Sequence, residues 1–304
     1  HKQKFQLGVQ VLQDHGFSVY LGGLARKGTA QGYRSASGKE RAREFMELYR
    51  NPAVSCLLAT IGGSNSSSMI EHLDYEYIAA NPKIVCGFSD VTSLHLALMH
   101  YAGLRTYYGP ALMTAFSEYP NGDTESIQHF LDALQGIDYP RVLQPFALWS
   151  NHFRSWDTDA WRQEKREWKE NKGWYVLQEG ECEGEIIIAN LNTLVSAAGT
   201  AYFPELQRKI LCIEEMSAPF SRLERNLMQL RLMGVYDKIA GLVFGKVEFL
   251  DPQGADFSRY DLLKECVGLR DYPIIADFDL AHTYPMFTVG QRTQISIQAQ
   301  KERN

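Results

Sequence analysis

The chain has 304 residues, of which 22% are charged, and a formal net charge of −5; a globular protein long enough for two domains is expected. The acidic balance gives no electrostatic reason to expect a nucleic-acid or membrane partner, and the longest charge-poor stretch, 186–204, is too polar to span a bilayer. No export signal opens the sequence. Five scattered cysteines without a C-x-x-C pair predict neither disulfides nor a metal site and fit the cytoplasm.

The first half of the chain alternates helical and strand patterns. Helices are expected over 3–15, 38–50, 67–80 and 90–102, and strands over Phe17–Leu21, Val54–Ile61 and Lys83–Phe88. Strands that are nearly continuous apolar runs, alternating with helices, indicate a parallel sheet covered on both faces. The sequence therefore predicts an α/β protein whose N-terminal domain is Rossmann-like.

The pattern changes after residue 140. All five tryptophans fall between Trp149 and Trp174, interleaved with a charged run. Beyond them we expect shorter strands and one amphipathic helix, over 185–188, 209–213, 220–233, 239–244, 273–276 and 293–299. We therefore predict an N-terminal domain over 1–140, a tryptophan-rich connector over 141–180 and a smaller, β-rich α/β domain over 181–304.

Gly62 and Gly63 open a strand-to-helix turn that continues through Ser64 and Asn65 to Ser68. Paired glycines let the backbone approach a ligand closely, and the following helix N-terminus offers N–H groups to negative charge. The same residues are equally typical of a tight turn with a serine helix cap. The turn lacks the lysine of a P-loop and the third glycine of a dinucleotide fingerprint, so it gives little support to ordinary nucleotide binding.

A second turn, 87–92, places Ser89 between the end of a strand and the start of a helix. In such a turn the serine hydroxyl is exposed above the sheet, and the helix N-terminus favours developing negative charge. Val91 stands where a standard nucleophile elbow has its second glycine. Ser89 is therefore a candidate nucleophile, and a simple helix cap is the alternative.

A serine nucleophile needs a base, and the base needs an acceptor that orients it. His95 and His100 lie along the helix after Ser89, where packing or solvent accounts for them. His282 differs, because it follows an apolar strand in a loop. Glu214 ends another apolar strand, from which a carboxylate can project into an interdomain cleft. These two residues are the candidate base and acceptor.

Short motifs run in order through nearly the whole chain. They are Ala59–Ser66, Leu73–Tyr75, Asn81–Ile84, Gly87–Thr92, Tyr108–Leu112, Asn190–Leu191, Gly199–Thr200, Ile210–Glu215, Arg222–Arg225, Ala240–Gly245 and His282. Together they resemble the LD-carboxypeptidase and microcin C immunity (MccF) family of serine peptidases.

The resemblance implies Ser89 as the nucleophile, His282 as the general base and Glu214 as the carboxylate that fixes the imidazole tautomer, in a cleft between the two domains. We expect the backbone N–H groups of Gly63 and Asp90 to form the oxyanion hole. This chemistry needs no metal and no other cofactor. The resemblance also suggests a homodimer.

Two features favour the MccF branch of the family. The first turn reads Gly-Gly-Ser-Asn-Ser rather than the Arg-Gly-Gly-Tyr-Gly that is usual in cell-wall LD-carboxypeptidases. The stretch between the nucleophile and the glutamate is also longer than in those enzymes, and it contains the connector. We therefore expect cleavage of the amide or acyl-phosphoramidate bond between an acidic amino acid and a nucleotide-like group, in small peptidyl or aminoacyl adenylates.

Substrate contacts are expected from Gly62, Ser64 and Asn65 in the first turn. In the connector, an aromatic side chain is expected to stack on the base, a contact worth about 1–3 kcal/mol. The candidates, with Trp149 and Trp156 preferred, are Phe146, Trp149, Phe153 and Trp156. The alternative is that these aromatics attach the connector to the domains or form a dimer contact.

Two other functions stay open. With the same triad, an LD-carboxypeptidase would release D-Ala from the tetrapeptide stem of a muropeptide. A non-catalytic protein would instead use the turn 62–68 to bind phosphate or a nucleotide. The substitution Ser89→Ala separates these hypotheses, because only a binding protein would be unaffected by it.

Overall fold

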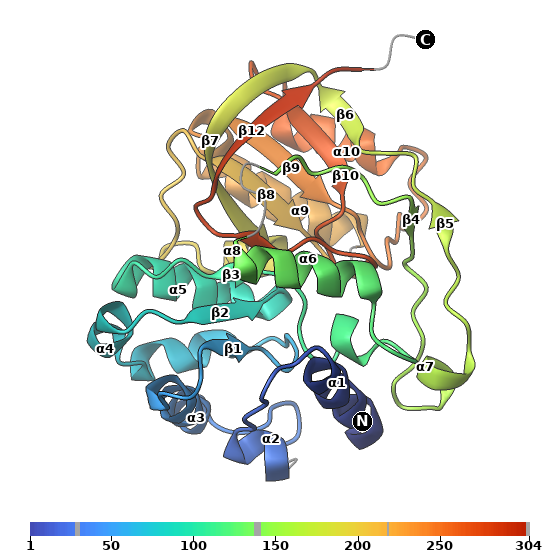
Figure 1. Ribbon diagram of the computed structural model, residues 1–304. Coiled ribbons are helices and arrows are strands. Elements are labelled where there is room, and N and C mark those ends of the chain that lie inside the picture. Colours follow the sequence, from blue (N-terminus) through green and yellow to red (C-terminus); the bar gives the residue numbers. More distant parts are fainter. Residues whose placement is uncertain (28–30, 137–140, 218, 302–304) are drawn as a thin grey trace. The chain divides into compact units, whose positions relative to one another are not determined.

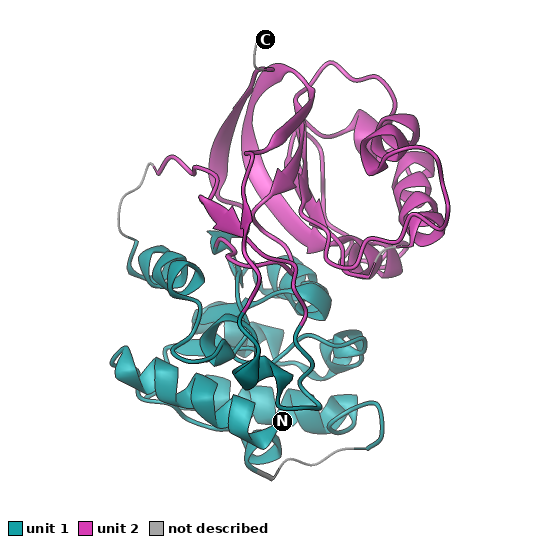
Figure 2. Cartoon of the chain, turned by 90° about the vertical axis from the view of Figure 1, so that its right-hand side faces the viewer, with its two compact units in different colours: residues 1–137, 154–165, 288–290 teal, residues 138–153, 166–287, 291–304 magenta. Residues whose placement is uncertain are grey.

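The computed structural model describes residues 1–27, 31–136, 141–217 and 219–301. The chain divides into two compact units (Figure 2). Unit 1 comprises residues 1–137, 154–165 and 288–290, and unit 2 comprises residues 138–153, 166–287 and 291–304. Each unit has its own sheet with helices around it, so the predicted α/β class is confirmed.

Unit 1 is built from short strands and the helices around them (Figure 1). Its elements are α1 (Lys2–Asp14), α2 (Gly23–Lys27), α3 (Gly38–Arg50), β1 (Cys56–Leu58), η1 (Ser66–His72), α4 (Tyr75–Ala80), β2 (Ile84–Gly87), η2 (Ser89–Val91), α5 (Thr92–Ala102), β3 (Tyr107–Tyr108), η3 (Ala115–Ser117), α6 (Thr124–Gln135), α7 (Ala160–Gln163) and β11 (Val289–Gly290). The sheet has the order β1-β2-β3-β11. Its first three strands are parallel, and β11 runs antiparallel to β3.

Alternate residues of these strands enter two separate cores. Leu57 and Val85 pack with residues of α3 and α5, whereas Cys86 packs with residues of α1 and α6. Because successive side chains of a strand point to opposite faces, the helices cover both faces of the sheet. The covered parallel sheet expected from the apolar strands is confirmed.

Two local predictions for unit 1 are wrong. The segment Phe17–Leu21 forms no strand; Phe17 and Val19 instead pack against the core beside α1 and α6, which accounts for their alternation. The helix expected over 67–80 is split into η1 and α4. The break falls at Asp74, whose carboxylate accepts a hydrogen bond from the Tyr77 N–H at 3.1 Å and so starts a new helix.

Unit 2 contains a larger sheet. Its elements are β4 (Leu148–Trp149), β5 (Lys169–Glu170), β6 (Tyr175–Gln178), β7 (Gly180–Asn190), α8 (Leu191–Ser196), β8 (Ile210–Glu214), α9 (Phe220–Leu232), η4 (Val235–Asp237), β9 (Gly241–Gly245), α10 (Arg259–Val267), β10 (Ile274–Phe278) and β12 (Gln294–Ala299). The strand order is β12-β7-β8-β9-β10-β6, and β4 and β5 form a separate ribbon. The four central strands are parallel and both edge strands are antiparallel.

The central strands of unit 2 set the positions of several polar residues. Every residue of β8 and β9 is buried, and α9 buries Leu223, Leu227 and Leu230 on one stripe. Asn190 is the last residue of β7 and lies directly opposite Glu214, the last residue of β8. Because parallel strands end at the same edge of a sheet, their polar end residues are brought together there.

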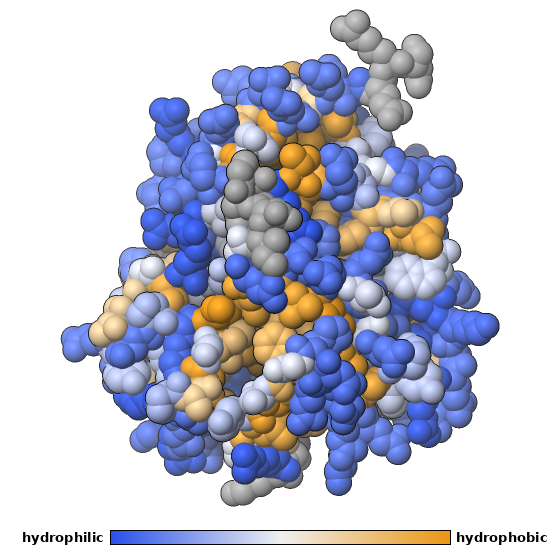
Figure 3. All heavy atoms as spheres, viewed as in Figure 1, coloured by the Kyte–Doolittle hydropathy of each residue, from blue (hydrophilic) through white to orange (hydrophobic). Residues whose placement is uncertain are grey.

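None of the helices in the described residues is both long and apolar enough to cross a membrane. On the face drawn in Figure 3, hydrophilic side chains cover most of the surface of both units, and apolar side chains show in patches.

Candidate active site

The two strand-to-helix turns of unit 1 lie against each other. They follow β1 and β2, which are parallel neighbours with Leu58 opposite Cys86. A Cβ atom on Gly62 would lie 2.9 Å from Ser89 Cβ and 3.0 Å from Ser89 Oγ. Only glycine lets the first turn approach Ser89 so closely.

Ser89 has a left-handed backbone conformation, with φ at 63°, which costs about 1–2 kcal/mol for a residue with a side chain. Its N–H donates a hydrogen bond to the phenol oxygen of Tyr108 at 3.1 Å, and Tyr108 is fully buried. In the same turn, His95 Nε2 from α5 lies 2.9 Å from the Gly87 carbonyl oxygen. Burial lowers the pKa of His95 to about 4, so a neutral ring donates this bond. A strained serine held in this way is typical of nucleophile turns.

The side chain of Asp90 organises the first turn. Its Oδ2 accepts hydrogen bonds from the N–H groups of Asn65 and Ser66 at 2.9 and 2.8 Å, and from the Ser66 hydroxyl at 2.6 Å. From α3, Arg41 donates to the Asn65 carbonyl at 3.0 Å and to the Ser68 hydroxyl at 2.7 Å. The turn is therefore held from both sides. The N–H of Asn65 is used within the protein.

Gly63 and Asp90, the predicted oxyanion-hole donors, lie in these adjoining turns. Gly63 has φ at 149°, in the region that favours glycine, and a Cβ atom there would lie 3.6 Å from Asp90 Oδ2. Ser64 follows at an exposed position. The structure thus brings the predicted turn residues together around Ser89. Their roles in binding and catalysis stay predictions.

In unit 2, His282 and Glu214 form a buried pair. His282 Nδ1 lies 2.6 Å from Glu214 Oε2, and their side chains are 9% and 0% exposed. A carboxylate on Nδ1 directs Nε2 of the ring outward from the pair, as a general base requires. Ser89 belongs to unit 1, so its pairing with His282 stays a prediction.

Asn190 holds the other oxygen of Glu214. Its Nδ2 donates to Glu214 Oε1 at 3.1 Å, while its Oδ1 accepts from the Thr193 N–H at 3.1 Å and caps α8. Both carboxylate oxygens of Glu214 are thus fixed by hydrogen bonds. The position of Asn190 opposite Glu214 follows from the ends of two neighbouring parallel strands.

The loop that carries His282 is held by two contacts within unit 2. A Cβ atom on Gly245 would lie 2.5 Å from the Leu280 carbonyl oxygen and 2.7 Å from Glu214 Cβ, so glycine is needed where β9 passes this loop. Ser150 and Tyr284 exchange backbone hydrogen bonds of 2.7 and 2.9 Å. The start of the connector and the His282 loop are therefore joined.

Several carboxylates act on His282. Burial lowers its pKa, but the charge and hydrogen bond of Glu214 and the charges of Glu248 and Glu215 outweigh burial, and the net pKa is raised above 6.5. Glu248 itself is 7% exposed. Burial raises the pKa of its carboxyl to about 7, and burial also raises the pKa of Glu215. The carboxylates of Glu214, Glu248 and Glu215 thus favour the imidazolium form of His282.

The predicted connector aromatics have different surroundings. Phe146 is 7% exposed and stacks on Phe287, with ring centroids 4.6 Å apart, so it has no face to offer a base. Trp149 is half-buried, with the ammonium groups of Lys169 and Lys246 5.2 and 5.6 Å from its ring centroid. Phe153 is 48% exposed.

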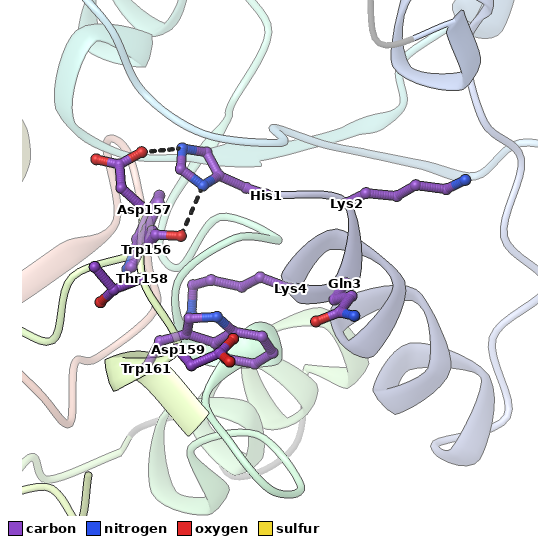
Figure 4. A pocket seen from close by; sticks show the side chains of 9 residues that line it. All are labelled: His1, Lys2, Gln3, Lys4, Trp156, Asp157, Thr158, Asp159 and Trp161. Carbon is purple, nitrogen blue, oxygen red and sulfur yellow. Dashed lines mark hydrogen bonds and ion pairs between the residues drawn. The ribbon is translucent and has the colours of Figure 1, made fainter. Parts of the chain in front are cut away.

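Trp156 lies in unit 1, in a hollow beside α1 (Figure 4). The His1 imidazole donates to the Trp156 carbonyl at 3.0 Å. The buried ammonium of Lys4 lies 5.0 Å from the ring centroid of Trp156 and 5.5 Å from that of Trp161. A second buried cation, Arg154, pairs with Glu118. These contacts attach the tip of the connector to unit 1, as one of the two sequence interpretations expected.

Comparison with known proteins gave consistent matches over both halves of the chain. A family model of the LD-carboxypeptidase N-terminal domain matches residues 1–109, and one of the LD-carboxypeptidase C-terminal domain matches residues 183–297. The microcin C7 self-immunity protein MccF of Escherichia coli is 37% identical over 97% of this chain and 86% of its own length. A putative carboxypeptidase of Vibrio cholerae is 35% identical over 93% of this chain and 83% of its own length.

Solved structures of MccF are also similar. Those in complex with glutamyl sulfamoyl guanosine and with aspartyl sulfamoyl adenosine match with a TM-score of 0.90 at 34% identity, and the match covers 98% of this chain and 88% of theirs.

Proposed function

Because the chain belongs to the LD-carboxypeptidase family of serine peptidases, we propose that it is an MccF-like hydrolase of aminoacyl or peptidyl nucleotides. The scissile bond is the amide or acyl-phosphoramidate bond between an acidic amino acid and a nucleotide-like group. The ligands of the MccF structures, an aspartyl and a glutamyl sulfamoyl nucleoside, support this choice of substrate.

The observation that carries the proposal is the oriented His282–Glu214 pair. In the proposed reaction, Nε2 of His282 removes the Ser89 hydroxyl proton as Oγ attacks the acyl carbon. The N–H groups of Gly63 and Asp90 donate to the oxyanion of the tetrahedral intermediate. His282 then gives its proton to the leaving nitrogen, and the bond between acyl carbon and nitrogen breaks.

The second half of the reaction reverses these roles. A water molecule gives a proton to His282 and attacks the acyl group on Ser89. The bond to Ser89 Oγ breaks, the serine regains its proton, and the acidic amino acid leaves as a free carboxylate. Throughout, Glu214 accepts the hydrogen bond from Nδ1 and stabilises the imidazolium ion of His282. The raised pKa of His282 agrees with that role.

Base stacking is assigned to one of the three connector aromatics that remain accessible, Trp149, Phe153 and Trp156. Individual alanine variants test the assignment: the Michaelis constant for an adenylate should rise in one of them. Unchanged constants in all three would refute stacking. We also propose that the protein is cytoplasmic and forms a homodimer. Light scattering tests the homodimer, for which it should give the mass of two chains.

The decisive experiment compares two substrates. The purified protein is incubated with aspartyl sulfamoyl adenosine and, separately, with a tetrapeptide muropeptide, and the products are weighed by mass spectrometry. We expect release of aspartate from the first and no reaction of the second, and no turnover of either by Ser89→Ala. Release of D-Ala alone would support the muropeptide carboxypeptidase instead. Ligand binding without turnover, unaffected by Ser89→Ala, would support a binding protein.

A further inference from the structure

A buried ion pair in unit 2 lies just before the loop that carries His282. Asp279 directly follows β10 and is fully buried, and Lys246 directly follows the neighbouring strand β9 and is 3% exposed. The Lys246 ammonium donates to Asp279 Oδ1 and, at 2.7 Å, to the Asp277 carbonyl. Apolar residues of similar volume often stabilise a core as well as such a pair does, so a role in fixing geometry is the more informative interpretation of it.

Two side chains that follow β5 in the connector donate to the same carboxylate. Asn171 Nδ2 lies 3.1 Å from Asp279 Oδ1 and 3.3 Å from Oδ2, and Trp174 Nε1 donates to Oδ2 at 2.9 Å. The Trp174 ring also packs against Phe278, with ring centroids 4.8 Å apart. Asp279 therefore joins the connector, the end of β9 and the end of β10.

The pair also fixes an irregular piece of backbone. The register of β10 against β9 shifts between Ile275 and Phe278, and Asp277 within this stretch has φ at 65°, a conformation that is unfavourable for a residue with a side chain. Lys246 holds both sides of the irregularity, because its ammonium binds the Asp277 carbonyl and its N–H donates to the Phe278 carbonyl at 3.0 Å. An irregularity of this kind changes the direction in which a strand ends.

The path from Asp279 to His282 is short and packed. The two residues between them, Leu280 and Ala281, are fully buried, and three residues span at most about 10 Å. A shift at Asp279 is therefore carried to the His282 ring. That ring has a strict requirement, since its Nδ1 must stay within hydrogen-bond distance of Glu214 Oε2, now at 2.6 Å.

We propose that Asp279 and Lys246 are positioning residues for His282. With Asn171 and Trp174 they set where the loop leaves β10, and they thereby hold the imidazole against Glu214. Neither residue has a part in the bond-breaking steps. The expected kinetic effects rest on the proposed function, whereas the position of the His282 ring can be measured without turnover.

Two variants test the proposal. Trp174→Phe keeps an aromatic ring beside Phe278 and removes one donor to Asp279, without a change of charge. Its kcat on aspartyl sulfamoyl adenosine should fall by roughly 10-fold with KM nearly constant. Lys246→Met removes the cation and should lower kcat by about 10- to 100-fold, the range for a hydrogen bond between charged groups.

The pKa of His282, followed by NMR titration of its ring proton and assigned with His282→Ala, separates positioning from electrostatics. The charge and hydrogen bond of Glu214 raise this pKa, so a displaced ring should have a lower pKa in both variants. Removal of the Lys246 charge by itself would raise the pKa, because a nearby cation disfavours the imidazolium ion. A lowered pKa in Lys246→Met therefore supports positioning, and a raised pKa there would overturn it.

The matched control is Leu227→Ala, which empties a fully buried position on α9 and should lower stability while kcat and the pKa of His282 stay unchanged. If Lys246→Met does not fold, Trp174→Phe decides: wild-type kcat and an unmoved pKa would overturn the proposal. Equal changes in the control would also overturn it. If the wild-type protein hydrolyses no substrate, the proposed function fails, and the titration still tests the position of the ring.

Discussion

Asn190 has two roles that substitution can separate. Its amide nitrogen donates to Glu214 Oε1 and its amide oxygen caps α8 at Thr193, both at 3.1 Å. In Asn190→Ser, the hydroxyl keeps the cap, because serine caps a helix about as well as asparagine. The serine side chain is too short to reach Glu214. In Asn190→Ala, both contacts are lost.

The expected sizes follow from these contacts. Removing the Asn190 donor from the buried Glu214 oxygen costs about 1–3 kcal/mol, and loss of a cap costs about 1 kcal/mol. The free energy of unfolding should therefore fall by about 1–3 kcal/mol in Asn190→Ser and by about 1 kcal/mol more in Asn190→Ala. Because Glu214 orients His282, kcat/KM should fall by about 10- to 100-fold, and by the same factor in both variants.

Urea unfolding and initial rates on aspartyl sulfamoyl adenosine measure the two effects. Ser258→Ala is the matched control, because Ser258 caps α10 and is none of the predicted site residues. It should lose about 1 kcal/mol of stability and keep its activity. The reasoning is refuted if Asn190→Ser retains full activity, or if activity falls with stability in the control as well.

Three further predictions concern the remaining parts of the site. Gly62→Ala should lower kcat by at least about 10-fold with little change in the free energy of unfolding, because the added methyl group meets Ser89 Oγ at 3.0 Å; normal kinetics would show that the turn can move away. Tyr108→Phe removes the acceptor of the Ser89 N–H and should lower kcat by roughly 10-fold with KM nearly constant, whereas a rise in KM alone would speak against a positioning role. The pH profile of kcat/KM should fall on the acid side through a pKa above 6.5, since protonation of His282 removes the base and its pKa is raised; in Glu214→Gln the residual activity should titrate at lower pH, and an unmoved profile would contradict the assignment.

The apolar periodicity predicted most of the fold. The helix predicted over 38–50 has the bounds of α3, and the parallel strands were predicted from the apolar runs. The strand expected over Phe17–Leu21 failed because alternation of apolar residues reports burial on one side, and a packed irregular segment gives the same pattern. The division of helix 67–80 was recognisable in principle, since Asp74 is a good N-cap.

Site residues could be predicted only where a side chain of suitable chemistry stands at the end of a predicted strand or in the loop that follows it. Glu214 and His282 were identified from their positions and the family resemblance, but Asn190 and Glu248 were not assigned roles. Asn190 could have been found, because it ends a strand next to that of Glu214. Glu248 lies three residues beyond β9, where an irregular extension pairs with Met216. Pairing of that kind leaves no periodic signal in the sequence.

The central claim is that Ser89 and His282 act as one unit, and a double-mutant comparison tests it most directly. The kcat for aspartyl sulfamoyl adenosine is measured for Ser89→Ala, His282→Ala and the double variant. When two residues act as one catalytic unit, removing either of them abolishes nearly all of the rate enhancement that the unit provides. We predict losses of several orders of magnitude in each single variant and no further loss in the double variant. A loss of kcat in the double variant equal to the product of the two single losses would contradict the account.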